Sequence, residues 1–109
     1  MTESEFMAVA QGILDALEQQ ADQWYDDLDI DVEAERSGNV LTLSFESGVK
    51  VIVNSQAPMQ EMWVAAPSGG FHYRLQGDAW KDTRGGPDLD DALSEICSTA
   101  AGTTLQVTL

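Results

Sequence analysis

The sequence predicts an α+β fold, a two-layer sandwich in which two roughly parallel helices pack on one face of an antiparallel β-sheet. Three observations predict it: a helical apolar period at the start of the chain, a meander of short runs with period two, and a second helical period near the end. The 109 residues suffice for one domain with its own core and are too few for two. Residues 1–109 are therefore expected to form a single domain.

The first element is a long helix that begins where Thr2 and Glu5 have the spacing of a capping box. Apolar residues then recur at steps of three and four: Phe6, Val9, Ala10, Ile13, Leu14, Leu17, Ala21 and Trp24. At about 100° per residue they fall in one sector, and the acidic residues fall opposite them. These acidic residues are Asp15, Glu18, Asp22 and Asp26. We expect them to face solvent.

From Leu28 the period changes to two. Ile30, Val32 and Ala34 alternate with Asp29, Asp31, Glu33 and Glu35, which predicts a half-buried edge strand with carboxylates on its exposed side. Carboxylates two apart on one strand face lie roughly 7 Å from each other, so each pair repels by about 0.6 kcal/mol in water. Glu18 to Glu35 contains eight carboxylates in eighteen positions, without one Lys or Arg. We call this stretch the acidic ridge.

The next two strands, residues 40–45 and 49–53, are joined by a turn whose length follows from side-chain parity. If the apolar residues of both strands face the core together, Phe45 must oppose Val49. This pairing predicts a three-residue loop, 46–48, with Gly48 in a left-handed conformation. It also directs Asn54, and by continuation Gln56, away from the core.

A third run, residues 59–66, follows the break at Pro58. Its parity turns Met62 and Val64 inward and Glu61 and Trp63 outward, which predicts a tryptophan on the sheet surface. The alternative is that Trp63 lies under a loop. An exposed aromatic side chain among amides is typical of a protein-docking site.

The remaining elements are short. Turn signals at 67–70 and 77–78 enclose a strand at 71–75, and Trp80 begins or caps a last strand. Gly85-Gly86-Pro87 opens the second helix, and Gly102 ends it. The apolar face of this helix consists of Leu89, Ala92, Leu93, Ile96 and Ala100, and Cys97 falls on its buried side. Residues 103–109 read as an extended tail beside the helices.

Charge and composition exclude several classes of function. Nineteen acidic residues against five basic give a net charge of -14, which disfavours nucleic acid and anionic membranes and favours cations and basic proteins. The single cysteine cannot form an internal disulfide, and there is no signal peptide or long apolar run. We expect a cytoplasmic protein.

The chemistry of the side chains argues against an enzyme. The carboxylates lie on convex elements with no sign of a pocket that would separate their pKa values, and no nucleophile is accompanied by a base. His72 is the only histidine, and it is expected near Trp63 rather than near the acids. Hard cations accept carboxylate ligands, but a solvated ridge does not converge on one centre. It predicts weak, exposed, multi-site cation binding; the alternative is a solvated face without a ligand.

Several motifs occur in a fixed order along the chain. They are Asn54-Ser-Gln56-Ala-Pro58 leading into Met62-Trp63, then Pro67-Ser-Gly-Gly70-Phe-His72-Tyr73, Trp80-Lys-Asp82 and a closing Leu-rich helix. Their order and spacing resemble bacterial frataxin, the CyaY family, over nearly the whole chain. The acidic first helix and the strand after it also resemble the acidic ridge of that family.

The resemblance implies an iron-binding adaptor of iron-sulfur cluster assembly that docks on a cysteine desulfurase and on the cluster scaffold and modulates their rate. The implied ligands of Fe²⁺ or Fe³⁺, with other divalent cations as competitors, are Glu18, Asp22, Asp26, Asp27, Asp29, Asp31 and Glu33. The implied partner contacts are Asn54, Gln56, Glu61, Trp63 and His72. A monomer is expected, with metal-driven oligomerisation as the alternative.

Two departures from the family pattern modify this expectation. Gln19, Gln20 and Gln23 stand where carboxylates are common, which shifts the expected metal binding toward Asp22, Asp26 and Asp27. Glu61 stands where the family usually has glutamine, so charge is added beside Trp63. The other hypothesis is a metal-independent module that inhibits or docks a basic partner through the acidic ridge alone.

Overall fold

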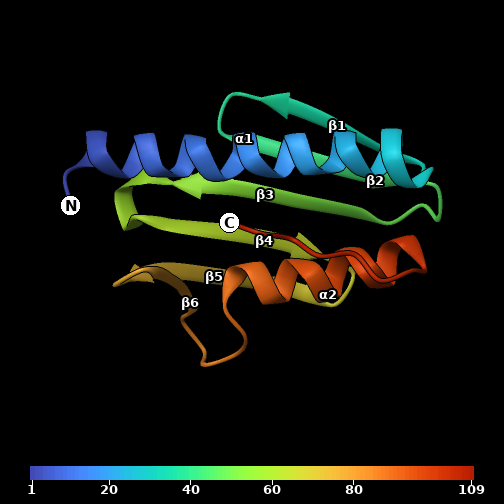
Figure 1. Ribbon diagram of the computed structural model, residues 1–109. Coiled ribbons are helices and arrows are strands. Elements are labelled where there is room, and N and C mark those ends of the chain that lie inside the picture. The colour runs from blue at the N-terminus through green and yellow to red at the C-terminus, as the bar shows by residue number, and fades with distance from the viewer.

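A computed structural model describes residues 1–109, and it has two helices on a six-stranded antiparallel sheet (Figure 1). The helices are α1 (Glu3–Leu28) and α2 (Leu89–Ala101), and a short 3₁₀ helix, η1, spans Ala57–Met59. The strands are β1 (Val32–Ser37), β2 (Val40–Phe45), β3 (Lys50–Gln56), β4 (Glu61–Ala66), β5 (Gly69–Gln76) and β6 (Ala79–Asp82). They lie side by side in chain order. The predicted α+β meander is confirmed.

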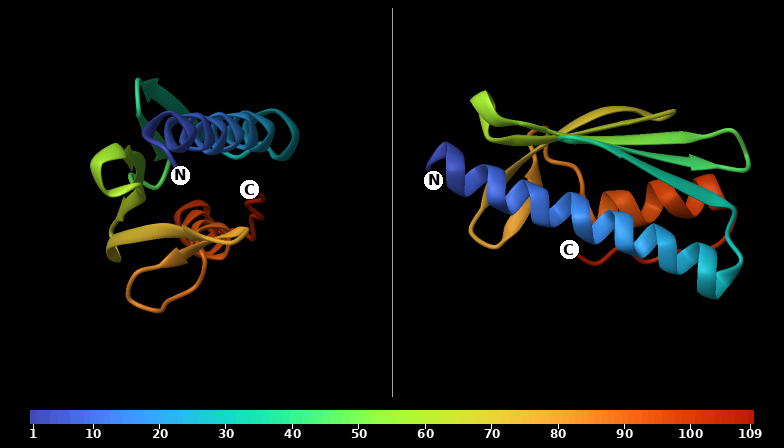
Figure 2. Two further views of the ribbon diagram at one scale, coloured as in Figure 1. Left: turned by 90° about the vertical axis from the view of Figure 1, so that its left-hand side faces the viewer. Right: turned by 90° about the horizontal axis from the view of Figure 1, so that it is seen from above.

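Both helices cover the same face of the sheet and run in about the same direction (Figures 1 and 2). Helix α1 packs over β1, β2 and β3, and α2 packs against β6 and β3. Between the two layers lies one cluster of 23 buried apolar side chains. We call the opposite side of the sheet the outer face. Neither helix combines the length and apolar character that crossing a membrane requires.

The start of α1 follows the predicted capping box. The Thr2 hydroxyl accepts a hydrogen bond from the Glu5 amide at 3.1 Å, and the Glu5 carboxylate accepts one from the Thr2 amide at 3.0 Å. The predicted apolar face is buried from Phe6 to Trp24. Val9 is the exception, because it is 39% exposed at the margin of that face.

The boundary between α1 and β1 differs from the prediction. Helix α1 continues to Leu28, Asp29 ends it in a left-handed conformation with φ of 54°, and β1 begins only at Val32. Asp29 and Asp31 therefore belong to a connection and not to the face of a strand. The alternation of apolar and acidic residues misled the prediction because it runs unchanged through a turn that reverses the chain. A short polar residue such as Asp tolerates this conformation.

The β2–β3 hairpin has the predicted register. Gly48, at φ of 91°, is left-handed, and the Phe45 amide donates to the Val49 carbonyl at 2.9 Å. Strand β4 begins at Glu61, later than expected, because Gln60 turns the chain with φ of 52°. Pro67 and Ser68 alone form the next turn, since Ala66 pairs with Gly69. These pairings fix the faces of the central strands.

The second helix also begins later than its turn residues suggested. Asp88 is the residue before the first turn, so Pro87 precedes α2 and does not lie in it. Gly102, at φ of 72°, ends α2 as predicted. Cys97 is fully buried in the core, and this burial raises the pKa of its thiol to about 12.

The last residues pack beside the helices, as predicted. The Ser98 hydroxyl accepts a hydrogen bond from the Leu105 amide at 2.8 Å, and the Ser94 hydroxyl accepts one from the Val107 amide at 2.8 Å. The side chains of Leu105 and Val107 are 3% and 1% exposed. The tail thus contributes to the core.

Gln20 of α1 holds the tail from the other side. Its amide nitrogen donates to the Thr108 carbonyl at 2.7 Å, and its amide oxygen accepts from the Thr108 amide at 2.9 Å. A carboxylate could accept the second bond but could not donate the first. The geometry explains why a glutamine suits this position of an otherwise acidic helix surface.

Candidate metal-binding ridge and partner-binding face

At the N-terminal end of the acidic ridge, a basic residue partly neutralises the carboxylates of α1. Arg36, on the inner side of β1, places its guanidinium Nη1 2.7 Å from the Asp15 carboxylate and 3.5 Å from the Glu18 carboxylate. The Arg36 side chain is 16% exposed, and its Nε also donates to the Gly38 carbonyl at 2.9 Å. Glu18 therefore has a cationic neighbour.

Further along α1 the carboxylates are free of such partners. Asp22, Asp26 and Asp27 are exposed on the helix surface, and none of them forms an ion pair. The last turn of α1 contains no basic residue, although the partial negative charge of a helix C-terminus favours one there. Uncompensated negative charge thus begins at Asp22 and increases toward the end of the helix.

A hollow of about 350 Å³ lies where the C-terminal ends of α1 and α2 meet the β2–β3 loop. Asp29, Asp31 and Glu46 line it together with Ala100 and Ala101 of α2, whose last turn also lacks a basic residue. The sequence prediction missed Glu46. Only the position of the β2–β3 loop beside the α1–β1 connection, where the Glu46 amide donates to the Asp31 carbonyl at 3.0 Å, reveals it.

The strand part of the acidic ridge is shorter than predicted. Glu33 and Glu35 lie opposite Ser44 and Thr42, so both project from the outer face at the edge of the sheet. They are the one carboxylate pair of the ridge that has strand spacing. No group of three or more His, Cys, Asp and Glu side chains is arranged to hold a metal ion.

The predicted partner-binding residues lie together on the outer face, centred on Trp63. The indole of Trp63 stacks on the His72 ring with centroids 4.1 Å apart and planes within 5°. Asn54 is the cross-strand neighbour of Trp63, and Gln56 is that of Glu61. Trp63, His72, Asn54 and Gln56 are all half-buried, so each retains an accessible edge.

Glu61 is directed outward as predicted, but it is not accessible. The side chain is 6% exposed, because Trp63 and Arg74 cover it. The Trp63 indole nitrogen donates to Glu61 Oε1 at 3.0 Å, Arg74 Nη2 donates to Oε2 at 2.6 Å, and His72 Nδ1 lies 3.7 Å from Oε1. The hydrogen bond from Trp63 and the neighbouring Arg74 keep the pKa of Glu61 below its usual value. Glu61 thus holds the side chains of Trp63, His72 and Arg74 in position.

The sequence prediction also missed two basic residues on this face. Arg74 lies opposite Glu61 on β5 and forms an ion pair with it at 2.6 Å, and Lys81 lies opposite Arg74 on β6 and forms an ion pair with Asp88 at 3.2 Å. Neighbouring carboxylates therefore neutralise both of these basic residues. The sequence could have revealed Arg74, because it is two residues from His72 on the same strand and therefore faces the same side of the sheet.

We expect Glu61→Gln to lower the free energy of unfolding by about 1.5 kcal/mol at neutral pH, because a charged hydrogen-bond acceptor for Arg74 and Trp63 is lost. The pKa of Glu61 is lowered in the folded state, so this stabilisation is fully present above the unfolded value of 4.5 and is lost as pH falls through the lower pKa of the folded state. Urea unfolding of both proteins at about pH 7 and about pH 3.5 measures the difference. A difference independent of pH would show that Glu61 acts through packing alone.

The arrangement of an acidic ridge beside an aromatic outer face on this fold can be compared with known proteins. The model of the frataxin-like domain family matches residues 1–103. The chain belongs to the CyaY family of bacterial frataxins. The predicted resemblance is confirmed, and the tail after residue 103 lies beyond the match.

The sequence relatives of this frataxin are similar over all or nearly all of their length. The chain is 63% identical to the iron-sulfur cluster assembly protein CyaY of Bordetella parapertussis over 109 residues, 100% of both chains. It is 56% identical to the CyaY protein of Cupriavidus metallidurans over 105 residues, covering 96% of this chain and 95% of the relative.

Solved frataxin structures have the same fold. Frataxin from Psychromonas ingrahamii superimposes with a TM-score of 0.79 at 30% identity, over 100% of both chains. Trimeric frataxin from Saccharomyces cerevisiae, complexed with ferrous iron, superimposes with a TM-score of 0.74 at 28% identity, over 86% of each chain.

Proposed function

We propose that this frataxin is a non-catalytic, cytoplasmic iron-binding adaptor of iron-sulfur cluster assembly. The observation that carries the proposal is the series of exposed, unpaired carboxylates from Asp22 to Glu33, on a chain whose relatives are named iron-sulfur cluster assembly proteins. In this proposal the acidic ridge holds iron and contacts a cysteine desulfurase, and the Trp63 face contacts the cluster scaffold.

Iron is proposed as a loosely held cargo. Carboxylate oxygens suit Fe²⁺ and Fe³⁺, and also suit Ca²⁺ or Mg²⁺ as competitors. The carboxylates do not converge, so each cation would retain much of its water and exchange readily. The yeast relative complexed with ferrous iron supports iron as the cation, and its trimeric state makes metal-driven association of this chain worth measuring.

The two proposed docking surfaces differ in chemistry. The acidic ridge is a highly charged surface with one exposed aromatic side chain, Tyr25, so its binding to a basic desulfurase surface would be fast and sensitive to salt. The Trp63 face has a half-buried aromatic pair, two amides and Arg74, which is the composition of a compact binding centre with a polar rim. One molecule could therefore contact two proteins at once.

The absence of a convergent ligand group favours a second candidate function. In this second function the acidic ridge only attracts a basic partner by charge. The protein then inhibits that partner or docks on it without carrying metal. Both functions predict association that weakens with salt. They differ in whether iron binds.

Anaerobic titration with Fe²⁺ is the experiment that separates them. We expect amide resonances between Asp22 and Glu33 to shift or broaden while those around Trp63 stay unchanged. The triple variant Asp22→Asn, Asp26→Asn, Asp29→Asn should lose this response. Without metal it should melt at a higher temperature than the natural protein, because repulsion within the acidic ridge is removed.

The matched control is Asp78→Asn, Asp91→Asn, Glu95→Gln, which removes the same charge away from the acidic ridge. It should keep the localised iron response. If millimolar Fe²⁺ produces no localised change while desulfurase binding is intact, iron carriage is wrong and the metal-independent module remains. If the ridge variant melts at a lower temperature, its carboxylates stabilise the fold.

A further inference from the structure

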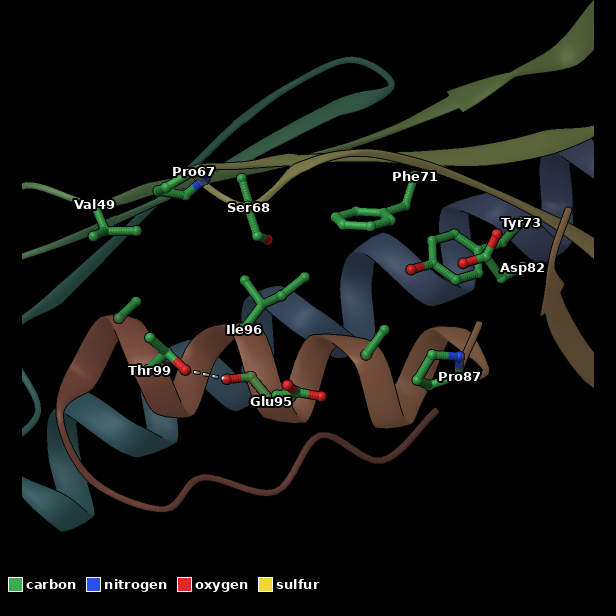
Figure 3. A pocket seen from close by; sticks show the side chains of 13 residues that line it. Val49, Pro67, Ser68, Phe71, Tyr73, Asp82, Pro87, Glu95, Ile96 and Thr99 are labelled. Carbon is green, nitrogen blue, oxygen red and sulfur yellow. Dashed lines mark hydrogen bonds between the residues drawn. The ribbon is translucent and has the colours of Figure 1, made fainter. Parts of the chain in front are cut away.

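A pocket of about 370 Å³ lies between α2 and the inner side of the β4–β5 hairpin (Figure 3), and one of its lining residues, Ala100, also lines the hollow beside Asp29, Asp31 and Glu46. Phe71 and Tyr73 project into it from β5, and Ile96 faces them from α2. Thirteen residues line it, seven of them hydrophobic, and its volume is in the range of small-ligand sites.

The pocket exists because small residues meet where the two layers should touch. Ala66 of β4 and Ala92 and Ala100 of α2 are among the residues that line the pocket, so small side chains occur on both layers. Ala92 and Ile96, which the sequence assigns to the buried face of α2, are consequently only half-buried. Apolar surface that the fold could have covered is left available.

One polar group in the pocket has no partner in the protein. Tyr73 is 1% exposed, its hydroxyl points into the pocket, and that hydroxyl forms no hydrogen bond with another residue. Burial and the nearby Asp82 carboxylate raise the pKa of Tyr73 to about 12, so the hydroxyl stays protonated and neutral. No buried side-chain nitrogen or oxygen lacks a hydrogen-bond partner, so this unpaired hydroxyl is accessible from the pocket, where a ligand can hydrogen-bond to it.

The charged residues that line the pocket determine whether a cationic or an anionic ligand is favoured. Asp82 and Glu95 are among the lining residues, and none of the thirteen is basic. The Asp82 carboxylate is oriented by the Arg84 amide, which donates to its Oδ1 at 2.8 Å. On a chain with a net charge of -14, an anionic ligand is disfavoured in this pocket and a cationic one is favoured.

We propose that this pocket is a binding site for a small aromatic amine. The aromatic ring lies between Phe71 and Ile96, and the ammonium group donates hydrogen bonds to the Tyr73 hydroxyl oxygen and to the Asp82 carboxylate. The site requires neither iron nor a protein partner, so it stands independently of the function proposed above.

Tryptamine and indole-3-propionate test the proposal on the full chain, because they share a ring system and carry opposite charges. At millimolar concentration tryptamine should shift amide resonances of residues 66–73 and 92–99 and raise the melting temperature. Indole-3-propionate should bind at least about tenfold more weakly. Equal binding of the two, or shifts confined to the acidic ridge, would overturn the proposal.

Three variants locate the site. Ala92→Leu should fill the pocket and abolish the tryptamine shifts, and Ala8→Leu, which places the same side chain on the exposed surface of α1, should not. Tyr73→Phe retains the ring and removes the hydroxyl, so it should weaken tryptamine binding about fivefold. Unchanged affinity in both Ala92→Leu and Tyr73→Phe would show that tryptamine binds elsewhere.

Discussion

Replacing Asp22, Asp26 and Asp27 with lysine is expected to weaken binding to a cysteine desulfurase about 100-fold at roughly physiological salt. Each exposed charge contact is worth about 0.5 kcal/mol, and reversal replaces it with a repulsion of similar size. Three sites therefore total about 3 kcal/mol, and 1.4 kcal/mol corresponds to tenfold in affinity. Calorimetric titration over a range of salt concentrations measures both the loss and its dependence on screening.

The fold should survive this change. The three residues lie near the C-terminal end of α1, where no basic residue is present and where lysine is favoured by the helix dipole. Thermal unfolding should show a protein at least as stable as the natural one. The matched control Asp78→Lys, Asp91→Lys, Glu95→Lys should bind much more strongly than the ridge variant; equal losses would indicate that net charge alone governs association.

Trp63→Ala is expected to weaken binding to the isolated cluster scaffold about 30-fold, the loss typical of a central aromatic residue in an interface. The half-buried indole supplies both the accessible edge and the surface on which His72 stacks. Its removal also takes away a hydrogen-bond donor from Glu61, so the Arg74 guanidinium loses part of its fixed position. Binding of the scaffold without desulfurase, followed by fluorescence or calorimetry, isolates this contact.

A loss of fold must be separated from a loss of contact in this experiment. Thr42→Ala removes a half-buried side chain from the same outer face on β2, and it should leave scaffold affinity unchanged. Trp63→Phe should retain most of the stacking and bind with intermediate affinity. If Trp63→Ala binds the scaffold as the natural protein does, the scaffold docks on another surface.

The fold was largely predictable because strand parity is a strict rule. Once Phe45 was placed opposite Val49, the loop length, the left-handed Gly48 and the outward direction of Asn54 followed, and the structure has all three. Capping at Thr2 and termination at Gly102 were predictable for a similar reason, since both depend on the chemistry of one or two residues.

Features that depend on distant segments were not predictable. Asp29 and Asp31 fitted a strand pattern, and only the left-handed turn at Asp29 placed them in a connection beside Glu46. The coverage of Glu61 depends on Arg74, which is thirteen residues away in sequence. Likewise, the pocket beneath Phe71 results from how α2 sits on the sheet, and no local pattern encodes that distance.

The pair of hydrogen bonds between the Gln20 side chain and the Thr108 backbone has a kinetic consequence. It joins positions 88 residues apart in sequence, so it closes nearly the whole chain into a loop and cannot form early without a large loss of chain entropy. The tail would then dock after the sheet and α2 are in place. Interactions that form late on a folding pathway chiefly slow unfolding. We therefore expect the seven residues after Gly102 to affect the rate of unfolding more than the rate of folding.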